Sequence, residues 1–500
     1  MSTPLSLTLR RAVALCGLCW LTSACAQIPA TPDTPLPAPV VRALQQEGLP
    51  ARAFYGVVAP VSPQGAPVMQ ARASQPVNPA SVMKLVTTFA AIDLLGQDFT
   101  WRTGFLTDGS ISGGSLRGNL YIRGGGDPKL VLERLQEAFV TLHNLGVQVV
   151  LGDIVLDQSA FALPPRDPHA FDGEGLRPYN AAPEALLVNF KSVILKFVPD
   201  PARGVAVVQS EPPLANLTID ATVPLSKGAC GDWRSALGAR FDDPNAIRFT
   251  GRFPSACGDS TWPVAYQDPA SYAERAIEGL WRASGGAITG QVRTGNTPPK
   301  ARLLHEAQSL PLTDIIADVN QWSNNVMAQQ VFLTLGRLPA NRVLEARVPT
   351  GPLQLPAVGR FDRSRERLTA WWNQRFGPQL PPPVLDNGSG LSREERITPL
   401  ALATLLRQAA VHPQSAAFVN SLAVAGESGT ARRLANGQRD PAKGRAQVKT
   451  GTLRDVSGIA GYVTTGSGAR YVVVGFINHP EAGKGRPALE ALLNWTADLP

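Results

Sequence analysis

The sequence predicts an α+β fold, in which helices pack on an antiparallel sheet and a large strand-rich insertion interrupts the chain. The last third of the chain gives the first indication: segments of strand character at 447–451, 458–463 and 470–477 precede a helical pattern at 487–495. Strands that close with a terminal helix are typical of helices layered on an antiparallel sheet. The second indication is the segment 101–293, where glycines and short apolar runs recur as in strands joined by turns.

Length and composition narrow the class of protein. A chain of 500 residues is expected to form about two to four domains. Its residues are 44% hydrophobic and 17% charged, which excludes a disordered chain. The 46 glycines and 44 prolines favour many turns over a helical bundle. A net charge of +8 without a dense run of Lys and Arg gives no support to nucleic-acid binding.

The N-terminus has the order of features of a secretory signal peptide. Two arginines, an apolar run and a small-residue site follow one another over residues 10–26. We expect cleavage near Ala26 and a soluble periplasmic chain, with peripheral membrane association as a further expectation. A lipoprotein anchored at Cys25 is the alternative, disfavoured because Thr22 stands where such signals usually carry Leu.

The cysteines and histidines bear on disulfides and metals. Three of the five cysteines lie in the predicted signal peptide and would be removed with it. Cys230 and Cys257 would remain in the mature chain. In an oxidising compartment this pair predicts one disulfide, with two free buried thiols as the alternative. The five histidines are scattered and form no pair with ligand spacing, so we predict no metal and no cofactor.

The elements of the N-terminal part follow from local signals. A helix is expected over 40–46 and two strands over 54–58 and 67–72. Asn78 and Pro79 are a favoured N-cap and a favoured first helical residue, and Gly96 can end the helix that they open. The later elements are predicted as helices at 131–145, 271–284, 312–319, 323–335 and 399–410, and strands at 120–123, 149–156, 193–197 and 205–208.

These elements suggest a catalytic domain in two parts. The expected boundaries are a Pro-rich tether at 27–39, the first part at 40–98, inserted domains at 99–267 with a sub-insertion at about 200–258, and the second part at 268–500. Both remaining cysteines fall in the sub-insertion.

Three short motifs suggest chemistry when taken together. Ser81-x-x-Lys84 lies in the first turns of a predicted helix, Ser323-Asn324-Asn325 opens another, and Lys449-Thr450-Gly451 lies on a predicted edge strand. Each is common by chance. In this order, they form the signature of penicillin-binding proteins and class A β-lactamases.

Serine and lysine in this arrangement predict nucleophilic catalysis. A serine hydroxyl needs a neighbouring base, and a lysine can serve if burial or another cation lowers its pKa. Lys84 is one helical turn from Ser81, and Lys449 is the natural second cation. Ser323 can relay a proton to the leaving group, and the Asn325 amide can hold a substrate carbonyl or Lys84.

The strand motif predicts substrate binding. Lys449 and Thr450 can bind a terminal carboxylate, and Gly451 leaves the strand edge open to an extended substrate. The backbone N–H groups of Ser81 and Thr452 are candidates for an oxyanion hole.

The chain resembles the class C low-molecular-weight penicillin-binding proteins, the S13 family of D-alanyl-D-alanine carboxypeptidases and endopeptidases. About 240 residues separate the first two motifs, and that family has a large two-domain insertion there. Further family stretches match at 124–128, 152–157, 386–393 and 425–430, so the resemblance covers about residues 40–499.

The resemblance implies the fold and the activity. The fold would be the penicillin-binding transpeptidase and β-lactamase-like domain with its insertion. The activity would be hydrolysis of D-Ala-D-Ala in peptidoglycan peptides through an acyl-enzyme on Ser81, with endopeptidase cleavage of cross-links and acylation by β-lactams. By resemblance Arg393 faces the substrate and Asp157 binds the amino group of a diaminopimelate side chain. Each also has a structural reading, as a surface arginine and as a residue that ends a strand.

Two alternatives stay open at this point. A β-lactamase would need efficient deacylation, but the sequence has no Glu-bearing loop of the class A kind at the matching place. A non-catalytic wall-binding scaffold would have no need to retain Ser81, Lys84 and the other motif residues together.

Overall fold

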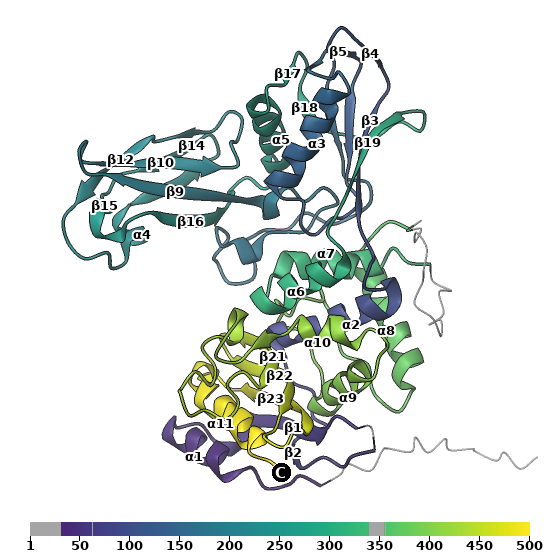
Figure 1. Cartoon of the computed structure of the whole chain (residues 1–500), viewed down its shortest axis with the longest axis vertical. Helices are drawn as coiled ribbons and strands as arrows, with labels where there is room; N and C mark the ends of the chain where they lie inside the picture. Colours follow the sequence, from purple (N-terminus) through teal and green to yellow (C-terminus); the bar gives the residue numbers. More distant parts are fainter. Residues whose placement is uncertain (1–31, 63, 340–354, 356) are drawn as a thin grey trace, which may run out of the picture. The chain divides into compact units, whose positions relative to one another are not determined.

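The computed structural model describes residues 32–62, 64–339, 355 and 357–500 (Figure 1). The predicted signal peptide and its cleavage site near Ala26 lie outside these residues. Among the described residues, no helix is both long and apolar enough to cross a membrane. Residues 33–39, expected in a tether, begin the folded part instead, since Thr34 pairs with the backbone of Gln70 and the first helix starts at Ala38.

A six-stranded antiparallel sheet forms the centre of the first domain, which confirms the predicted fold class. The strand order is β2-β1-β23-β22-β21-β20. The bounds are β1 (Phe54–Pro60), β2 (Met69–Ala71), β20 (Ala423–Val424), β21 (Ala446–Leu453), β22 (Val456–Thr464) and β23 (Arg470–Asn478). The first and last parts of the chain therefore meet, because β1 pairs with β23 along its whole length.

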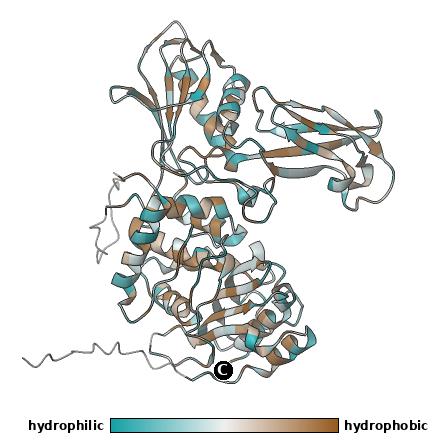
Figure 2. Cartoon of the chain, turned by 180° about the vertical axis from the view of Figure 1, so that it is seen from behind, coloured by the Kyte–Doolittle hydropathy of each residue, from teal (hydrophilic) through white to brown (hydrophobic). Residues whose placement is uncertain are grey.

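Helices cover both faces of this sheet. On one face α1 (Ala38–Gln46) and α11 (Arg486–Ala497) bury Val40, Leu44 and Leu492 against the strands. On the other face lie α2 (Lys84–Leu95), α6 (Leu312–Trp322), α7 (Asn325–Leu335), α8 (Phe361–Phe376), α9 (Pro399–Ala410) and α10 (Ser415–Asn420). Figure 2 shows hydrophobic residues along the strands of the sheet. Helix α2 is buried on nearly all sides, as expected for a helix that is apolar all round.

The insertion contains further sheets. One has the order β18-β8-β6-β3-β19 and a second β17-β7-β5-β4, with α3 (Leu132–Asn144) and α5 (Tyr272–Ala283) in the same apolar cluster. The strands are β3 (Arg102–Thr107), β4 (Ser110–Ser112), β5 (Ser115–Arg117), β6 (Leu120–Arg123), β7 (Val149–Val150), β8 (Ile154–Asp157), β17 (Ala287–Ile288), β18 (Val292–Thr294) and β19 (Arg302–Gln308). The single strand expected at 149–156 is thus two strands.

The sub-insertion has two small sheets and a short helix, α4 (Trp233–Ala236). The sheet orders are β15-β12-β10-β9-β16 and β11-β14-β13. The strands are β9 (Ser192–Asp200), β10 (Val205–Glu211), β11 (Thr218–Ile219), β12 (Thr222–Ser226), β13 (Ala239–Asp243), β14 (Ala246–Phe249), β15 (Phe253–Pro254) and β16 (Ser260–Ala265). Cys230 and Cys257 form a disulfide here, as the sequence predicts.

The pairing of the later strands bears on the domain boundary. Residues 268–308 were expected in the catalytic domain, but α5 packs in the cluster of the insertion. Strand β18 pairs with β8, and β19 pairs with β3. We propose that the insertion runs to about residue 308, and that the second part of the catalytic domain begins just before α6.

Candidate active site

The segment that carries Ser81 is held in a fixed and strained turn. Ser81 lies in a single 3-10 turn, Ala80–Met83, that leads directly into α2. The Asn78 side chain accepts a hydrogen bond from the Ala80 N–H at 2.8 Å, while Ala80 has a positive φ of 49°. An alanine rarely adopts this conformation, and such strain is typical of functional sites. The helix that the sequence predicts from Asn78 to Gly96 therefore begins with a 3-10 turn.

Lys84 lies beneath Ser81 and is fully buried. Its Nζ is 3.0 Å from the Ser81 Oγ, 2.6 Å from the Asn325 Oδ1 and 2.5 Å from the Ser389 carbonyl oxygen. Burial first, and then the nearby Lys449, lower the pKa of Lys84 well below its usual range, while Glu395 raises it. A neutral amine can donate to the two carbonyl-type oxygens and keep its lone pair for the Ser81 proton. This geometry suits a general base.

Ser323 and Lys449 form the second half of the site. Ser323 has a left-handed backbone conformation, with φ 59° and ψ 33°, and follows the end of α6. The next residue, Asn324, caps α7 by accepting a hydrogen bond from the Met327 N–H. The Lys449 Nζ donates to the Ser323 Oγ at 2.9 Å and to the Thr450 carbonyl oxygen at 2.7 Å. Burial lowers the pKa of Lys449 to about 7.

The close approach of strand and turn explains the glycine of the strand motif. A Cβ at Gly451 would lie 2.8 Å from the Pro79 carbonyl oxygen and 3.1 Å from the Ser81 nitrogen, too close for any side chain. Gly451 therefore allows β21 to pack against the turn that carries Ser81. The structure thus brings together Ser81, Lys84, Ser323, Asn325, Lys449, Thr450, Gly451 and Thr452.

Strand β21 has an open edge along the Lys449-Thr450-Gly451 motif, as predicted, although its first part is covered. Strand β20 pairs with Gln447 and Val448, and no strand in the described part of the chain pairs on that side with 449–453. The Thr450 hydroxyl donates to the Thr430 hydroxyl at 2.7 Å. The unpaired stretch is where an extended peptide could add as a strand.

A hollow of about 400 Å³ opens over this group. We call it the Ser81 pocket, and its walls include Ser81, Ser323, Thr450, Thr452 and Arg433. Lys84 and Lys449 do not line it, because both lie behind the hydroxyls to which they are bonded. A direct contact between Lys449 and a substrate carboxylate, expected from the sequence, is therefore not part of our proposal.

Arg433 was missed by sequence reasoning, which had no signal to separate it from Arg432 beside it. Arg433 is exposed and lines the Ser81 pocket. Within the described part of the chain, no hydrogen bond or ion pair ends on its guanidinium. A cation without a protein partner beside the nucleophile is suited to an anionic group of the substrate.

The two residues assigned by resemblance alone lie outside the Ser81 pocket. The Arg393 guanidinium forms an ion pair with the Asp455 carboxylate at 2.8 Å. Its central carbon lies 4.9 Å from the centre of the Phe171 ring, which belongs to the insertion. Asp157 is buried, and its two carboxylate oxygens accept from the Ser159 and Thr297 N–H groups. These contacts give Asp157 a structural role, and binding of a diaminopimelate amine stays a prediction.

Glu395 is a further residue that sequence reasoning missed. Its carboxylate is fully buried and accepts three backbone N–H groups of residues 386–388 at 2.8–3.2 Å. Burial raises the pKa of Glu395 to about 6. The loop that it holds presents the Ser389 carbonyl oxygen to Lys84. Glu395 therefore positions a hydrogen-bond acceptor of Lys84 and also acts on it by charge.

Glu395→Gln should move the acidic limb of the pH profile of kcat/KM to lower pH. The charged carboxylate raises the pKa of Lys84, so its removal lets Lys84 lose its proton at a lower pH. Glutamine retains an oxygen for the backbone N–H groups. The measurement is hydrolysis, from pH 5 to 9, of a D-Ala-D-Ala peptide, the substrate that the resemblance implies, with the exposed Glu394→Gln as control. An acidic limb at the same pH in Glu395→Gln as in the unmodified protein would contradict the effect of Glu395 on the pKa of Lys84.

Comparisons with known proteins identify the family of this chain. The chain matches the model of the D-Ala-D-Ala carboxypeptidase 3 (S13) family over residues 37–348 and 366–499. It is 25% identical over 408 residues to the D-alanyl-D-alanine carboxypeptidase DacB of Haemophilus influenzae, covering 81% of each chain. It is 28% identical over 436 residues to the D-alanyl-D-alanine carboxypeptidase of Actinomadura sp. (strain R39), covering 82% of this chain and 75% of that one.

A solved structure shows that the fold is shared. The crystal structure of penicillin binding protein 4 (dacB) from Haemophilus influenzae has a TM-score of 0.71 and 22% identity to this chain. It covers 91% of this chain and 98% of that one, so the resemblance in fold includes the insertion. The chain therefore belongs to the D-Ala-D-Ala carboxypeptidase 3 (S13) family of serine peptidases.

Proposed function

We propose that this protein is a periplasmic carboxypeptidase and endopeptidase of peptidoglycan, with Ser81 as its acylated nucleophile. The hydrogen bond from the buried Lys84 to Ser81 supports this proposal most strongly, because it pairs a serine with a lysine of lowered pKa. The substrates are stem peptides that end in D-Ala-D-Ala and cross-links in which D-Ala is joined to diaminopimelate.

Acylation begins when neutral Lys84 takes the hydroxyl proton of Ser81. The Ser81 Oγ attacks the carbonyl carbon of the penultimate D-Ala, and the N–H groups of Ser81 and Thr452 stabilise the resulting oxyanion. Collapse breaks the amide bond, and the proton that Lys84 took passes through Ser323, which lies against Lys449, to the leaving amine, so Lys84 is neutral again. D-Ala departs and leaves an ester on Ser81.

Deacylation repeats these roles with water as the nucleophile. Water adds to the ester carbonyl as Lys84 takes its proton, and the ester bond to Ser81 breaks. Lys84 returns that proton to the Ser81 oxygen, and the shortened peptide leaves as a free acid. A β-lactam presents a strained amide and a carboxylate to the same groups, so we propose that it also acylates Ser81.

The free carboxylate of the leaving residue is proposed to bind among Thr450, Thr452 and Arg433. Two hydroxyls and the guanidinium of Arg433, which has no hydrogen-bond or ion-pair partner among the described residues, line this part of the Ser81 pocket. A carboxylate accepts bidentate hydrogen bonds from arginine more strongly than from neutral donors. Terminal D-Ala, a cross-linked diaminopimelate and a β-lactam all carry such a carboxylate next to the amide nitrogen.

Arg433→Ala should raise the KM for a D-Ala-D-Ala peptide by about 10–100-fold, because a charge-assisted hydrogen bond is lost. The KM for the same peptide with an amidated C-terminus should change little in Arg433→Ala, because the amide carries no charge for Arg433 to bind. Arg432→Ala is the matched control, since Arg432 is exposed but does not line the Ser81 pocket. An equal rise in KM for the free-acid peptide and for the amidated peptide would contradict carboxylate binding by Arg433.

The direct test of the activity is the identity of the products. The purified protein should release D-Ala from a stem pentapeptide, and should split a cross-linked dimer into two monomers. Mass spectrometry of both digests measures carboxypeptidase and endopeptidase activity separately. Absence of both activities would overturn the proposed function.

A further inference from the structure

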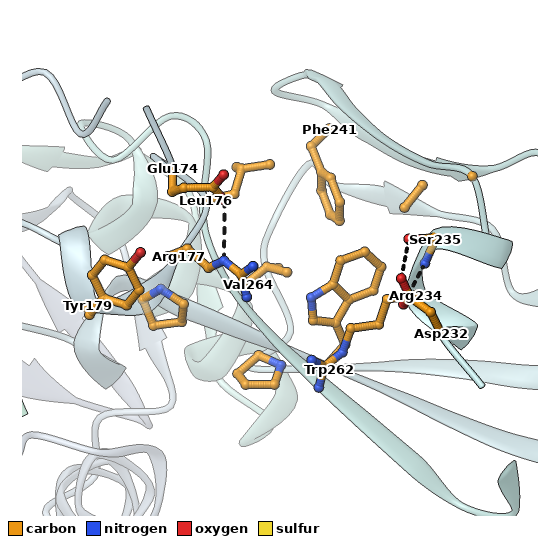
Figure 3. Close-up of a pocket in the computed structure, with 14 residues that line it drawn as sticks. Glu174, Leu176, Arg177, Tyr179, Asp232, Arg234, Ser235, Phe241, Trp262 and Val264 are labelled. Carbon is orange, nitrogen blue, oxygen red and sulfur yellow. Dashed lines mark hydrogen bonds and ion pairs between the residues drawn. The ribbon is translucent and has the colours of Figure 1, made fainter. Parts of the chain in front are cut away.

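A second hollow of about 670 Å³ lies in the insertion, and it shares no lining residue with the Ser81 pocket (Figure 3). Its walls come from α4, from β13 and β16, and from residues 174–179. The last two of these residues belong to the 3-10 segment Pro178–Asn180. We call it the Trp262 pocket. Its volume is in the range of pockets that hold small ligands.

The lining of the Trp262 pocket combines aromatic rings with balanced charge. The rings of Trp262 and Phe241 pack edge to face, with 5.5 Å between their centroids, and Figure 3 shows both beside the hollow. Two arginines, Arg177 and Arg234, and two carboxylates, Glu174 and Asp232, complete the charged lining. The equal numbers of cations and anions favour a neutral polar ligand over a polyanion.

Covalent and hydrogen bonds fix the walls. Asp232 caps α4 by accepting from the Ser235 N–H at 3.3 Å and from its hydroxyl at 2.6 Å. The Cys230–Cys257 disulfide anchors the chain just before this cap. On the opposite wall the Ala265 N–H donates to the Leu176 carbonyl at 2.8 Å, which joins the segment 174–179 to β16. Such bonds pre-organise a binding site.

Tyr179 connects the Trp262 pocket to the catalytic group. Its side chain is exposed and lines the Trp262 pocket, while its carbonyl oxygen accepts from the Asn325 Nδ2 at 3.2 Å. Asn325 in turn contacts Lys84. One residue of the insertion therefore lines the Trp262 pocket and contacts a residue of the catalytic group.

We propose that the Trp262 pocket binds an N-acetylated sugar of the glycan strand to which the stem peptide is attached. A pyranose offers an apolar C–H face to an aromatic ring, and its hydroxyl and acetamido groups can pair with arginines and carboxylates at the rim. The inference rests on the proposed function, because it assigns to the Trp262 pocket the sugar part of the polymer whose peptide part binds at Ser81.

The test compares two soluble substrates. One is the stem pentapeptide alone, and the other is the same pentapeptide on the disaccharide N-acetylglucosaminyl-N-acetylmuramic acid. The full-length exported protein should have a kcat/KM about tenfold higher for the disaccharide-linked substrate, mostly through a lower KM. If the protein hydrolyses neither substrate, the proposed function fails. If it hydrolyses both equally well, only the sugar site is overturned.

Two variants locate the preference. Trp262→Ala removes the ring face, and Arg234→Ala removes an exposed side chain whose loss should leave the fold intact. Each should bring the kcat/KM ratio of the two substrates close to one. The control is Arg240→Ala, since Arg240 is an exposed arginine of β13 that does not line the pocket. A sugar preference that persists in both Trp262→Ala and Arg234→Ala would overturn the assignment.

Discussion

Lys84→Met is expected to lower kcat/KM for release of D-Ala by about 10³-fold, because it removes the general base. Methionine fills nearly the same volume, so the packing of α2 should be retained although Lys84 is fully buried. The substitution leaves the Asn325 and Ser389 oxygens without their donor but does not alter Ser81 itself. The acylation step, in which Ser81 must lose its proton, should therefore slow most.

Two measurements check this expectation. Single-turnover reaction with a chromogenic β-lactam gives the acylation rate, and thermal unfolding reports whether the variant is folded. Lys300→Met is a suitable control, since Lys300 is exposed and lies outside the Ser81 pocket. Acylation of Lys84→Met at the rate of the unmodified protein would show that another group takes the Ser81 proton.

Lys449→Met is expected to lower kcat/KM at pH 7 by about 10–100-fold. The substitution has two effects. The Ser323 hydroxyl loses its donor at 2.9 Å, so proton delivery to the leaving amine is less well oriented. The pKa of Lys84 also rises, because the charge of Lys449 no longer opposes its protonation.

The sign of the pH effect distinguishes this account from simple loss of a substrate contact. Lys84 acts as a base only when it is unprotonated, so a rise of its pKa moves the acidic limb of kcat/KM to higher pH. Activity of Lys449→Met should recover in part on the alkaline side. Glu395→Gln should move the same limb in the opposite direction. A limb that stays in place in Lys449→Met would contradict the coupling of the two lysines.

Local signals in the sequence were sufficient for many elements. Thr398 and Pro399 are a cap and a first-turn proline, and α9 has the predicted bounds of 399–410. Gly96 ends the helical segment that carries Ser81, as predicted, but the segment begins at Ala80 after Pro79, one residue later than a cap at Asn78 would place it. Such signals act within a few residues along the chain, which is why they can be read without the tertiary structure.

Other features depend on contacts between residues far apart in the sequence. The close packing of Gly451 on Ser81 and the carbonyl contact of Ser389 with Lys84 have no pattern in the sequence. Helix α8 was not predicted, and its mean hydropathy is low although Trp371 and Trp372 are buried. The later boundary of the insertion that we propose rests on such contacts too, because the amphipathic pattern of α5 does not show which domain the helix packs against.

The central claim is that Ser81 is the residue that becomes acylated. Incubation of the purified protein with a fluorescent penicillin, followed by digestion and mass spectrometry, tests it most directly. The account predicts a long-lived adduct on the peptide that contains Ser81, and no adduct on Ser81→Ala. Rapid turnover without a trapped adduct would instead favour a β-lactamase. An adduct that persists in Ser81→Ala, or that forms on another residue, would contradict the proposed mechanism.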